Sequence, residues 1–317
     1  MYAFRDPTGV GYFNHQPLKT GTTLQATETT YKLIKKIKDD RFDEDKIPQY
    51  ELLLNLGTRD FQVGIVDTND NRFLLLEDYV FPNVSSQDEL IGALDVLFEA
   101  HAFLKANYWK VIKVSLKNQN FVQVPQALFS EDALVDYLKF NAHINTEEED
   151  FLPVFLKNTQ AVTVFAIHKD VRDWFRNIYP NNDPKFVHQS AVLIDGVMEA
   201  AKNKPGNPLY IYIDRFKLHV LSVHNGNLIF YNQFIIKQFA DYIKYIMLVM
   251  KSLNMNQQTS QVILWGYIGK NSPHYHEFYK YINNVAFGER PAGIEFSYFF
   301  DEAQDHHFFD LYSIHLL

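Results

Sequence analysis

Residues 49–82 read QYELLLNLGTRDFQVGIVDTNDNRFLLLEDYVFP, and residues 208–236 read PLYIYIDRFKLHVLSVHNGNLIFYNQFII. Each stretch contains three apolar or alternating runs separated by turn residues, such as Gly57 and Thr58 in the first. Runs of this kind are typical of β-strands joined by hairpins. We therefore predict two three-stranded units, and their likeness indicates an internal duplication.

A helix and a further strand follow each unit. Residues 85–107 have a serine N-cap and apolar residues at helical spacing, and residues 109–116, WKVIKVSL, read as a strand. Residues 237–254 repeat the helical spacing, and residues 261–270, QVILWGYIGK, form a strand that ends in a glycine turn. The alternation of strand and helix predicts an α/β fold in which helices flank a mixed sheet.

The pattern predicts three parts of the chain. Residues 1–45 are expected to form an arm, which lies on the rest of the chain or on a neighbouring subunit, and a short helix within 31–45. Residues 46–205 are the first domain, with an inserted subdomain around 118–158. Residues 206–317 are the second domain.

Composition excludes several kinds of site. The 317 residues include no cysteine, so disulfides, thiolate metal sites and cysteine nucleophiles are ruled out. The net charge of -8 argues against an electrostatic grip on nucleic acid or on an anionic membrane. No run approaches the roughly 20 apolar residues of a membrane span. We expect a cytoplasmic protein with no nucleic-acid partner and no membrane span.

The duplicated layout resembles that of the actin-like ATPase superfamily. The motif FDEDKIPQYELLLNLG at 42–57, taken with this layout, is similar to an uncharacterised bacterial domain-of-unknown-function family with a degenerate actin-like fold. Residues 161–198 resemble the pilus-assembly actin-like proteins in their rhythm of strands and helices. The resemblance covers 45–317 and implies two ribonuclease-H-like mixed-sheet domains in an actin-like arrangement.

The resemblance also implies three loops of a nucleotide site. Glycines are expected there because backbone N–H groups must approach phosphates closely, and an acid is expected for magnesium. The first loop has an amide in place of its acid, the second has bulky residues in place of glycines, and the third has one glycine replaced by an aromatic residue. The matching positions are Asn55, Gly57, Thr58, Asp214, Gly266 and Gly269. We read them as vestigial positions with structural roles in turns, and we assign no catalytic residue.

Three large side chains stand at or near these loops. Phe216 lies in the second loop, and Trp265 and Tyr267 lie beside Gly266 in the third. Each aromatic ring of the third loop either fills the space of an adenine or stacks on one. We predict that Phe216, Trp265 and Tyr267 together fill the cleft between the two halves.

One further cluster lies near the end of the sequence. His306 and His307 are flanked by acids, which makes metal binding one reading of the cluster, while a solvated loop is the reading we prefer. We therefore expect neither metal nor cofactor. The neighbouring acids are Asp301, Glu302, Asp305 and Asp310.

Two main hypotheses about function follow. The first is a non-enzymatic protein-interaction or scaffold protein that has lost ATP hydrolysis and that binds an unidentified protein or a second copy of itself. The second is an ATP-binding protein or small-molecule kinase that uses ATP and magnesium at Gly57, Thr58, Asp214 and Gly266. A third hypothesis, nucleic-acid processing, is disfavoured by the charge.

Overall fold

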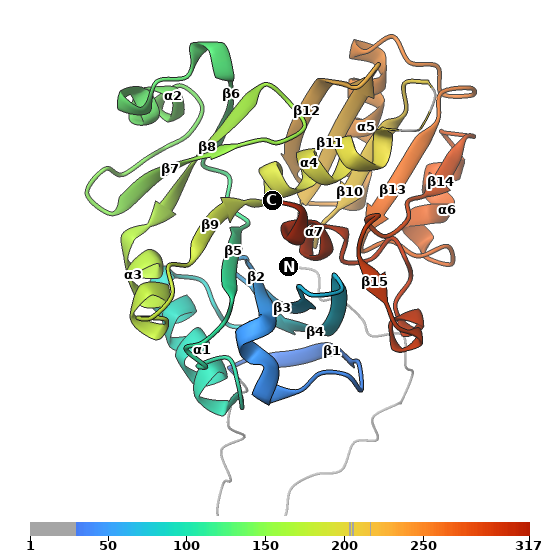
Figure 1. Ribbon diagram of the computed structural model, residues 1–317. Helices are drawn as coiled ribbons and strands as arrows, with labels where there is room; N and C mark the ends of the chain where they lie inside the picture. The colour runs from blue at the N-terminus through green and yellow to red at the C-terminus, as the bar shows by residue number, and fades with distance from the viewer. Residues whose placement is uncertain (1–29, 203, 205, 216) are drawn as a thin grey trace, which may run out of the picture.

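The computed structural model describes residues 30–202, 204, 206–215 and 217–317 (Figure 1). Almost all of the predicted arm, and Phe216 of the predicted plug, lie outside the described residues. Figure 1 shows one sheet at the bottom of the view, a second at the upper right and a small third sheet at the upper left.

The first sheet has seven strands in the order β1-β4-β3-β2-β5-β9, and β15 pairs with β4. Strands β2, β3 and β4 form an antiparallel meander, whereas β5 runs parallel to β2 after a crossover through α1. The N-cap of α1 is Ser86, which shares a capping box with Glu89. The bounds are β1 Lys32–Lys38, β2 Tyr50–Leu56, β3 Asp60–Asp67, β4 Arg72–Val80, α1 Gln87–Ala100, β5 Val111–Leu116, β9 Lys185–His188 and β15 Glu295–Phe296.

The second sheet has five strands in the order β12-β11-β10-β13-β14. It repeats the layout of the first, because β10, β11 and β12 form an antiparallel meander and β13 returns parallel to β10 after α5. The predicted strands and helices of both units are thus confirmed, while the duplication itself stays a prediction. The bounds are β10 Leu209–Ile213, β11 Lys217–His224, β12 Asn227–Ile235, α5 Phe239–Ser252, β13 Val262–Gly266, α6 Pro273–Tyr279 and β14 Val285–Phe287.

The third sheet has three antiparallel strands in the order β6-β8-β7. Sequence reading did not predict β7, because it follows an acidic run and contains Pro153. Pro153 is tolerated because β7 is an edge strand. The bounds are β6 Phe121–Pro125, η2 Gln126–Leu128, η3 Glu131–Ala133, α2 Leu134–Lys139, β7 Glu149–Phe155, β8 Ala161–His168 and α3 Lys169–Ile178.

The prediction of a short helix within residues 31–45 is wrong for residues 32–38. Lys32–Lys38 form the edge strand β1, which pairs antiparallel with β4. Burial of Ile37 and the 2.7 Å ion pair between Lys36 Nζ and Glu77 Oε1 fix β1 on the sheet, so tertiary pairing overrides local helix preference. A 3₁₀-helix, η1 Glu44–Gln49, follows.

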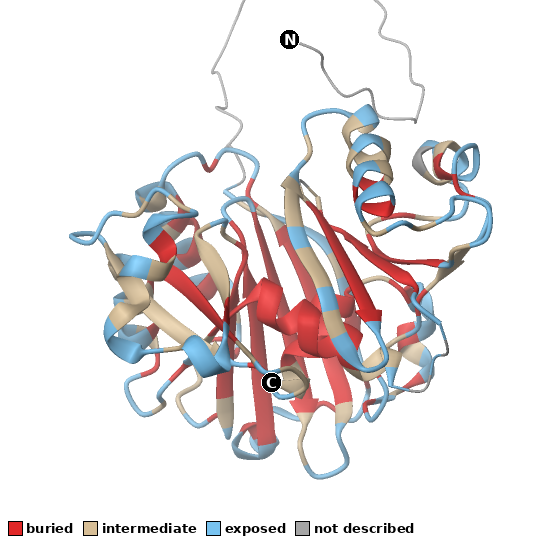
Figure 2. Cartoon of the chain, turned by 90° about the horizontal axis from the view of Figure 1, so that it is seen from above, coloured by how far each residue is buried: buried red, intermediate tan, exposed pale blue. Residues whose placement is uncertain are grey.

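Two buried helices lie where the large sheets meet. Helix α4 (Gln189–Ala201) packs on one face of the five-stranded sheet, and α7 (Phe309–Ser313) contacts α4, β2, β3 and β13. Figure 2 shows the buried residues gathered at the centre of the molecule. The C-terminal segment thus covers the core, together with η4 Tyr298–Glu302 and η5 Ile314–Leu316. Within the described ranges, no helix has the length and apolar character needed to cross a membrane.

Gly196 sets how closely α4 approaches α7. A Cβ atom at Gly196 would lie 2.6 Å from Ser313 Oγ, whereas a Cβ atom at Gly92 of α1 would have no neighbour within 4 Å. We expect Gly196→Ala to lower the free energy of unfolding by about 1–3 kcal/mol through overpacking. Gly92→Ala should instead raise it by about 0.5–1 kcal/mol through helix propensity. Urea denaturation measures both, and equal effects of the two variants would contradict the close packing.

Candidate functional site

The turns predicted from Gly57 and Asp214 meet at the junction of the two large sheets. The Gly57 N–H donates to the Asp60 carbonyl at 2.9 Å, which closes the β2–β3 turn. The Asp214 N–H donates to the Lys217 carbonyl at 2.9 Å in the corresponding β10–β11 turn. A Cβ atom at Gly57 would lie 2.1 Å from Asp60 Oδ1, so a larger residue there would displace the Asp60 carboxylate.

Lys117 lies between these turns, directly after β5. Its N–H donates to the Leu56 carbonyl at 2.8 Å, which holds it beside the Gly57 turn. Its Nζ is 2.6 Å from Asp60 Oδ2, 3.6 Å from Asp214 Oδ1 and 3.7 Å from Asp310 Oδ2, and the side chain is only 1% exposed. One buried ammonium group therefore faces three carboxylates from β3, the β10–β11 turn and α7.

Arg215 makes a second bridge between the halves. Its guanidinium lies 2.5 Å from Asp78 Oδ2 and 3.4 Å from Asp60 Oδ2, and it stacks 4.5 Å from the ring centroid of Tyr267. The Tyr267 hydroxyl accepts a 2.7 Å hydrogen bond from Gln62 Nε2. Ion pairs, a cation–π contact and a hydrogen bond thus cross the same junction.

Buried amides complete the cluster around Asp310. Asn55 Nδ2 donates to Asp310 Oδ2 at 2.8 Å and to Gln62 Oε1 at 2.9 Å. Gln189 Nε2, at the start of α4, donates to Asp310 Oδ2 and to Asp214 Oδ2, both at 3.0 Å. The amide that replaces the expected acid at position 55 is therefore a hydrogen-bond donor to a carboxylate.

The charges in the cluster stabilise one another. Burial alone raises the pKa of Asp214, but the ammonium groups of Lys117 and Lys217 outweigh it and hold that pKa below its usual range. Burial alone lowers the pKa of Lys117, but Asp214, Asp60 and Asp310 outweigh it and raise that pKa. Both groups are consequently charged at neutral pH.

The third predicted loop lies at the end of β13. Gly266 has φ +93°, and a Cβ atom there would lie 2.1 Å from the Ile213 carbonyl oxygen, so the position requires glycine. The Tyr267 N–H donates to that same carbonyl at 2.8 Å. Gly269 lies further along the loop, where Gln304 Oε1 would be 3.8 Å from its Cβ.

Of the aromatic side chains predicted to fill the cleft, Tyr267 lies at the junction of the two sheets and Trp265 does not. Trp265 stacks on Tyr210 and Phe309 under the five-stranded sheet, and its indole N–H donates to the Glu289 carbonyl at 2.9 Å. Tyr267 does reach the junction, where it contacts Arg215. Among the described residues, the side chains between the two turns are therefore mainly charged, and Trp265 belongs to the core.

The space that remains is small. A cavity of about 180 Å³ lies between the two turns, and its lining includes Thr58, Lys117 and Lys217. Sites for small molecules and cofactors usually measure about 300–1,000 Å³. The acids that would hold magnesium are already paired with Lys117, and no group of three or more metal-binding side chains is arranged around a metal position within the described residues. The residues as placed do not fit a magnesium nucleotide.

The interpretation of the His306 cluster as a solvated loop is wrong for His306 itself. Its ring is buried, with Nε2 2.5 Å from the Ile268 carbonyl, and its own carbonyl accepts a 2.8 Å bond from the Gly266 N–H. Burial lowers the pKa of His306. His306 therefore supports the Gly266 turn, while Asp310 points into the Lys117 cluster.

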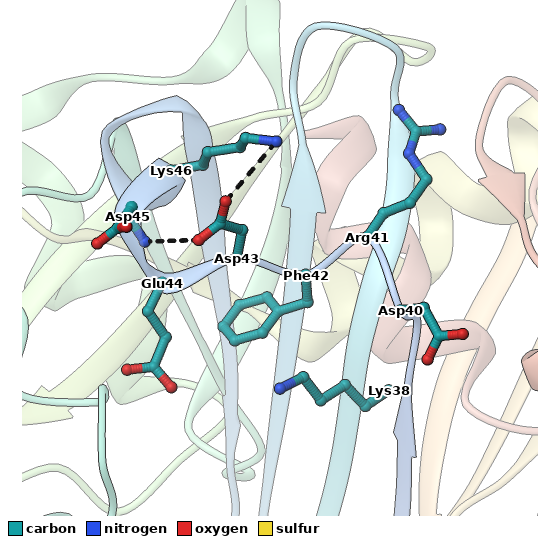
Figure 3. Close-up of a pocket in the computed structure, with 8 residues that line it drawn as sticks. All are labelled: Lys38, Asp40, Arg41, Phe42, Asp43, Glu44, Asp45 and Lys46. Atoms are coloured by element: carbon teal, nitrogen blue, oxygen red, sulfur yellow. Dashed lines mark hydrogen bonds and ion pairs between the residues drawn. The ribbon is translucent and has the colours of Figure 1, made fainter.

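A larger hollow, of about 580 Å³, lies along the loop between β1 and β2 (Figure 3). All eight residues that line it come from the single segment 38–46. Figure 3 shows Lys46 paired with Asp43, at 3.8 Å, and Phe42 beside the chain of Lys38. Seven of these eight residues are charged, with both signs present, and only Phe42 is apolar, so we do not assign a site there.

Sequence reading missed most of the cluster. It found Asn55 and Asp214 but not Lys117, Asp60 or Gln189. Lys117 could have been found, because it directly follows the buried strand β5. Strands β5 and β2 are parallel, so their carboxyl ends lie at the same edge of the sheet and place Lys117 beside the Gly57 turn. Asp310 was grouped with the His306 cluster instead, because its actual partners lie far away in the sequence.

Comparison with solved structures defines the class of fold. A Bacteroides thetaiotaomicron protein with actin-like ATPase fold and unknown function matches with a TM-score of 0.69 at 24% identity, covering 78% of this chain and 93% of that one. The PilM-PilN type IV pilus biogenesis complex matches with a TM-score of 0.53 at 13% identity, covering 84% and 97%. The predicted pair of ribonuclease-H-like mixed sheets in an actin-like arrangement, related in layout to pilus-assembly proteins, is confirmed.

Comparison of sequences gives the family. A family model matches residues 39–285, and the chain belongs to that family, which is described as protein of unknown function, DUF3822. No curated protein matches the chain in sequence. The predicted membership of a domain-of-unknown-function family is thereby confirmed.

Lys117 is expected to be essential for stability. Lys117→Met should lower the free energy of unfolding by about 3–5 kcal/mol, because three buried carboxylates lose their shared cation. Urea denaturation at neutral pH measures this loss. The control is Lys139→Met, whose exposed pair with Asp136 should contribute less than about 1 kcal/mol. A loss no larger than that of the control would show that Lys117 does not hold the cluster together.

His219 provides a prediction for pH dependence. The ring lies buried in β11 with Nδ1 2.9 Å from the Tyr231 hydroxyl, and burial lowers its pKa from 6.5 to about 3. Because the unfolded chain binds a proton that the folded chain excludes, stability should fall by about 1.4 kcal/mol per pH unit below 6.5.

His219→Gln should remove the contribution of His219 to the fall of the free energy of unfolding between pH 6.5 and about 4.5. Urea denaturation at several pH values measures this change. His143→Gln, at an exposed position, serves as the control and should leave the slope unchanged. An unaltered slope in His219→Gln would mean that the folded protein protonates His219 without cost.

Proposed function

We propose that this protein is a non-enzymatic protein-interaction or scaffold protein that uses an actin-like fold without a nucleotide. The observation that carries the proposal is the Lys117 cluster: an internal ammonium group, paired with Asp60 at 2.6 Å, lies where the two turns converge. The Lys117 ammonium group gives the surrounding carboxylates the positive charge that a bound metal ion gives to carboxylates in metal sites of other proteins. Under this proposal, the protein no longer hydrolyses ATP.

A second argument concerns motion. Nucleotide-driven change in a two-part protein needs halves that separate and close around the ligand. Here Arg215, from the second sheet, is ion-paired with Asp78 of the first at 2.5 Å, and α7 packs against both sheets. Contacts of this kind favour one fixed arrangement, which is suitable for a binding surface.

The interaction role has one further support from the comparisons. A chain of the PilM-PilN type IV pilus biogenesis complex has this fold, so the fold occurs within a protein assembly. The absence of cysteine agrees with a cytoplasmic location, which we include in the proposal together with a protein partner or a second copy. The division into an arm at 1–45 and domains at 46–205 and 206–317 belongs to the same proposal.

Titration with ATP and magnesium tests the proposal. We expect the melting temperature to stay constant as ATP rises, because a ligand that does not bind the folded state cannot stabilise it. Differential scanning fluorimetry gives the melting temperature. ADP with magnesium and magnesium alone are the parallel titrations that separate nucleotide binding from an effect of the ion.

A melting temperature that rises steadily with ATP concentration would overturn the proposal in favour of the ATP-binding protein or kinase. If that rise occurs, Lys117→Met should alter it, since Lys117 lines the cavity between the turns. A constant melting temperature together with release of phosphate from ATP would also contradict the non-enzymatic role.

A further inference from the structure

A groove of about 430 Å³ lies along the outer side of α5, far along the chain from the Lys117 cluster. Three of the five methionines of the protein line it, and Leu248 in its wall is 57% exposed. Flexible methionine side chains adapt to apolar partners and are common at binding surfaces. The lining residues are Lys244, Met247, Leu248, Met250, Lys251, Met255 and Gln257.

The end of α5 builds one side of this groove. Asn254 takes the left-handed conformation with φ +54°. The Met255 N–H then donates to the Met250 carbonyl at 2.8 Å, and the Asn254 N–H donates to the Lys251 carbonyl at 3.2 Å. This is the Schellman arrangement, which brings the residue after the turn against the last turn of the helix. Met255 is thereby folded back towards Met250.

The charge of the groove has one sign. Lys244 and Lys251 line it, and none of the described residues in its lining is acidic. The nearby Asp241 carboxylate instead accepts the N–H groups of Lys237 and Gln238 at the start of α5. The two lysines are seven residues apart on α5, so their Cα atoms lie about 10 Å apart, two helical turns, on the same side.

We propose that this groove binds an acidic amphipathic helix of another protein. The apolar side of such a helix contacts Met247, Leu248 and Met255, and acids about two turns apart pair with Lys244 and Lys251. This helix would be the partner in the proposed interaction role, so the biological meaning of the binding rests on the proposed function. Its physical basis lies in the groove alone.

A membrane surface fits these features less well. An anionic bilayer extends over a whole face of the protein, and the net charge of -8 opposes that approach. A short helix senses chiefly the charges within about 10 Å, and the charged residues that line the groove are Lys244 and Lys251. The concave shape of the groove also suits a rod-like partner better than a flat surface.

The test uses the full chain with ¹³C-methyl methionine and a synthetic peptide of about 18 residues, or five helical turns. The peptide carries leucine on one side and glutamate on the other. We expect saturable shifts of the Met247, Met250 and Met255 methyl signals, while Met198, which is buried in α4, does not move. A scrambled peptide and a peptide with lysine in place of glutamate should give no such shifts.

Charge reversal supplies the matched variants. Lys244→Glu with Lys251→Glu should weaken binding of the glutamate peptide at least tenfold and should create binding of the lysine peptide. Lys105→Glu with Lys139→Glu, at exposed positions outside the groove, should leave the affinity unchanged. An affinity for the glutamate peptide that survives reversal at the groove would overturn the proposal.

Three further results would also overturn it. They are the absence of saturable shifts, groove shifts caused by phosphatidylglycerol vesicles but not by the peptide, and shifts that grow with protein concentration without a probe. The second result indicates a membrane surface and the third a second copy of the chain. ATP binding in the earlier titration would refute the nucleotide-free role but would leave the peptide result intact.

Discussion

The structure depends on a single buried cation, the ammonium group of Lys117. Four parts of the chain place charged groups at this point: β3, the residue directly after β5, the β10–β11 turn and α7. A buried carboxylate without a partner is costly, and Lys117 is the cation that these three acids share. Any change that removes the cation therefore affects both large sheets and the C-terminal segment together.

Under the proposed function, this arrangement would allow an actin-like framework to persist without a nucleotide. Turns built to approach phosphates would leave unpaired polar groups if they simply lost the nucleotide. Here the side chains of Lys117 and Arg215 fill and neutralise the junction, and Asn55 donates to Asp310 in place of binding a metal-bound water. The fold thus retains its geometry, while its central contacts are all internal.

Local sequence patterns were sufficient for most of the secondary structure and for part of the site. The meander at 49–82 and the N-cap at Ser86 were predictable because hairpin and helix signals act over a few residues. The edge strand β1 and the Pro153-containing strand β7 were not, because pairing with β4 and β8 decided them. Asn55 and Gly57 were found as site positions, whereas Lys117 and Asp310 were not.

The sequence by itself determined the α/β class, the repeated order of elements and the loss of the expected acid at Asn55. Each of these follows from residue type and spacing along a short stretch. Only the tertiary structure decided that Lys117 pairs with Asp310, because the two residues lie 193 positions apart by their numbers and meet only when the sheets close. It also decided that Trp265 packs in the core, since burial depends on neighbours that sequence spacing does not specify.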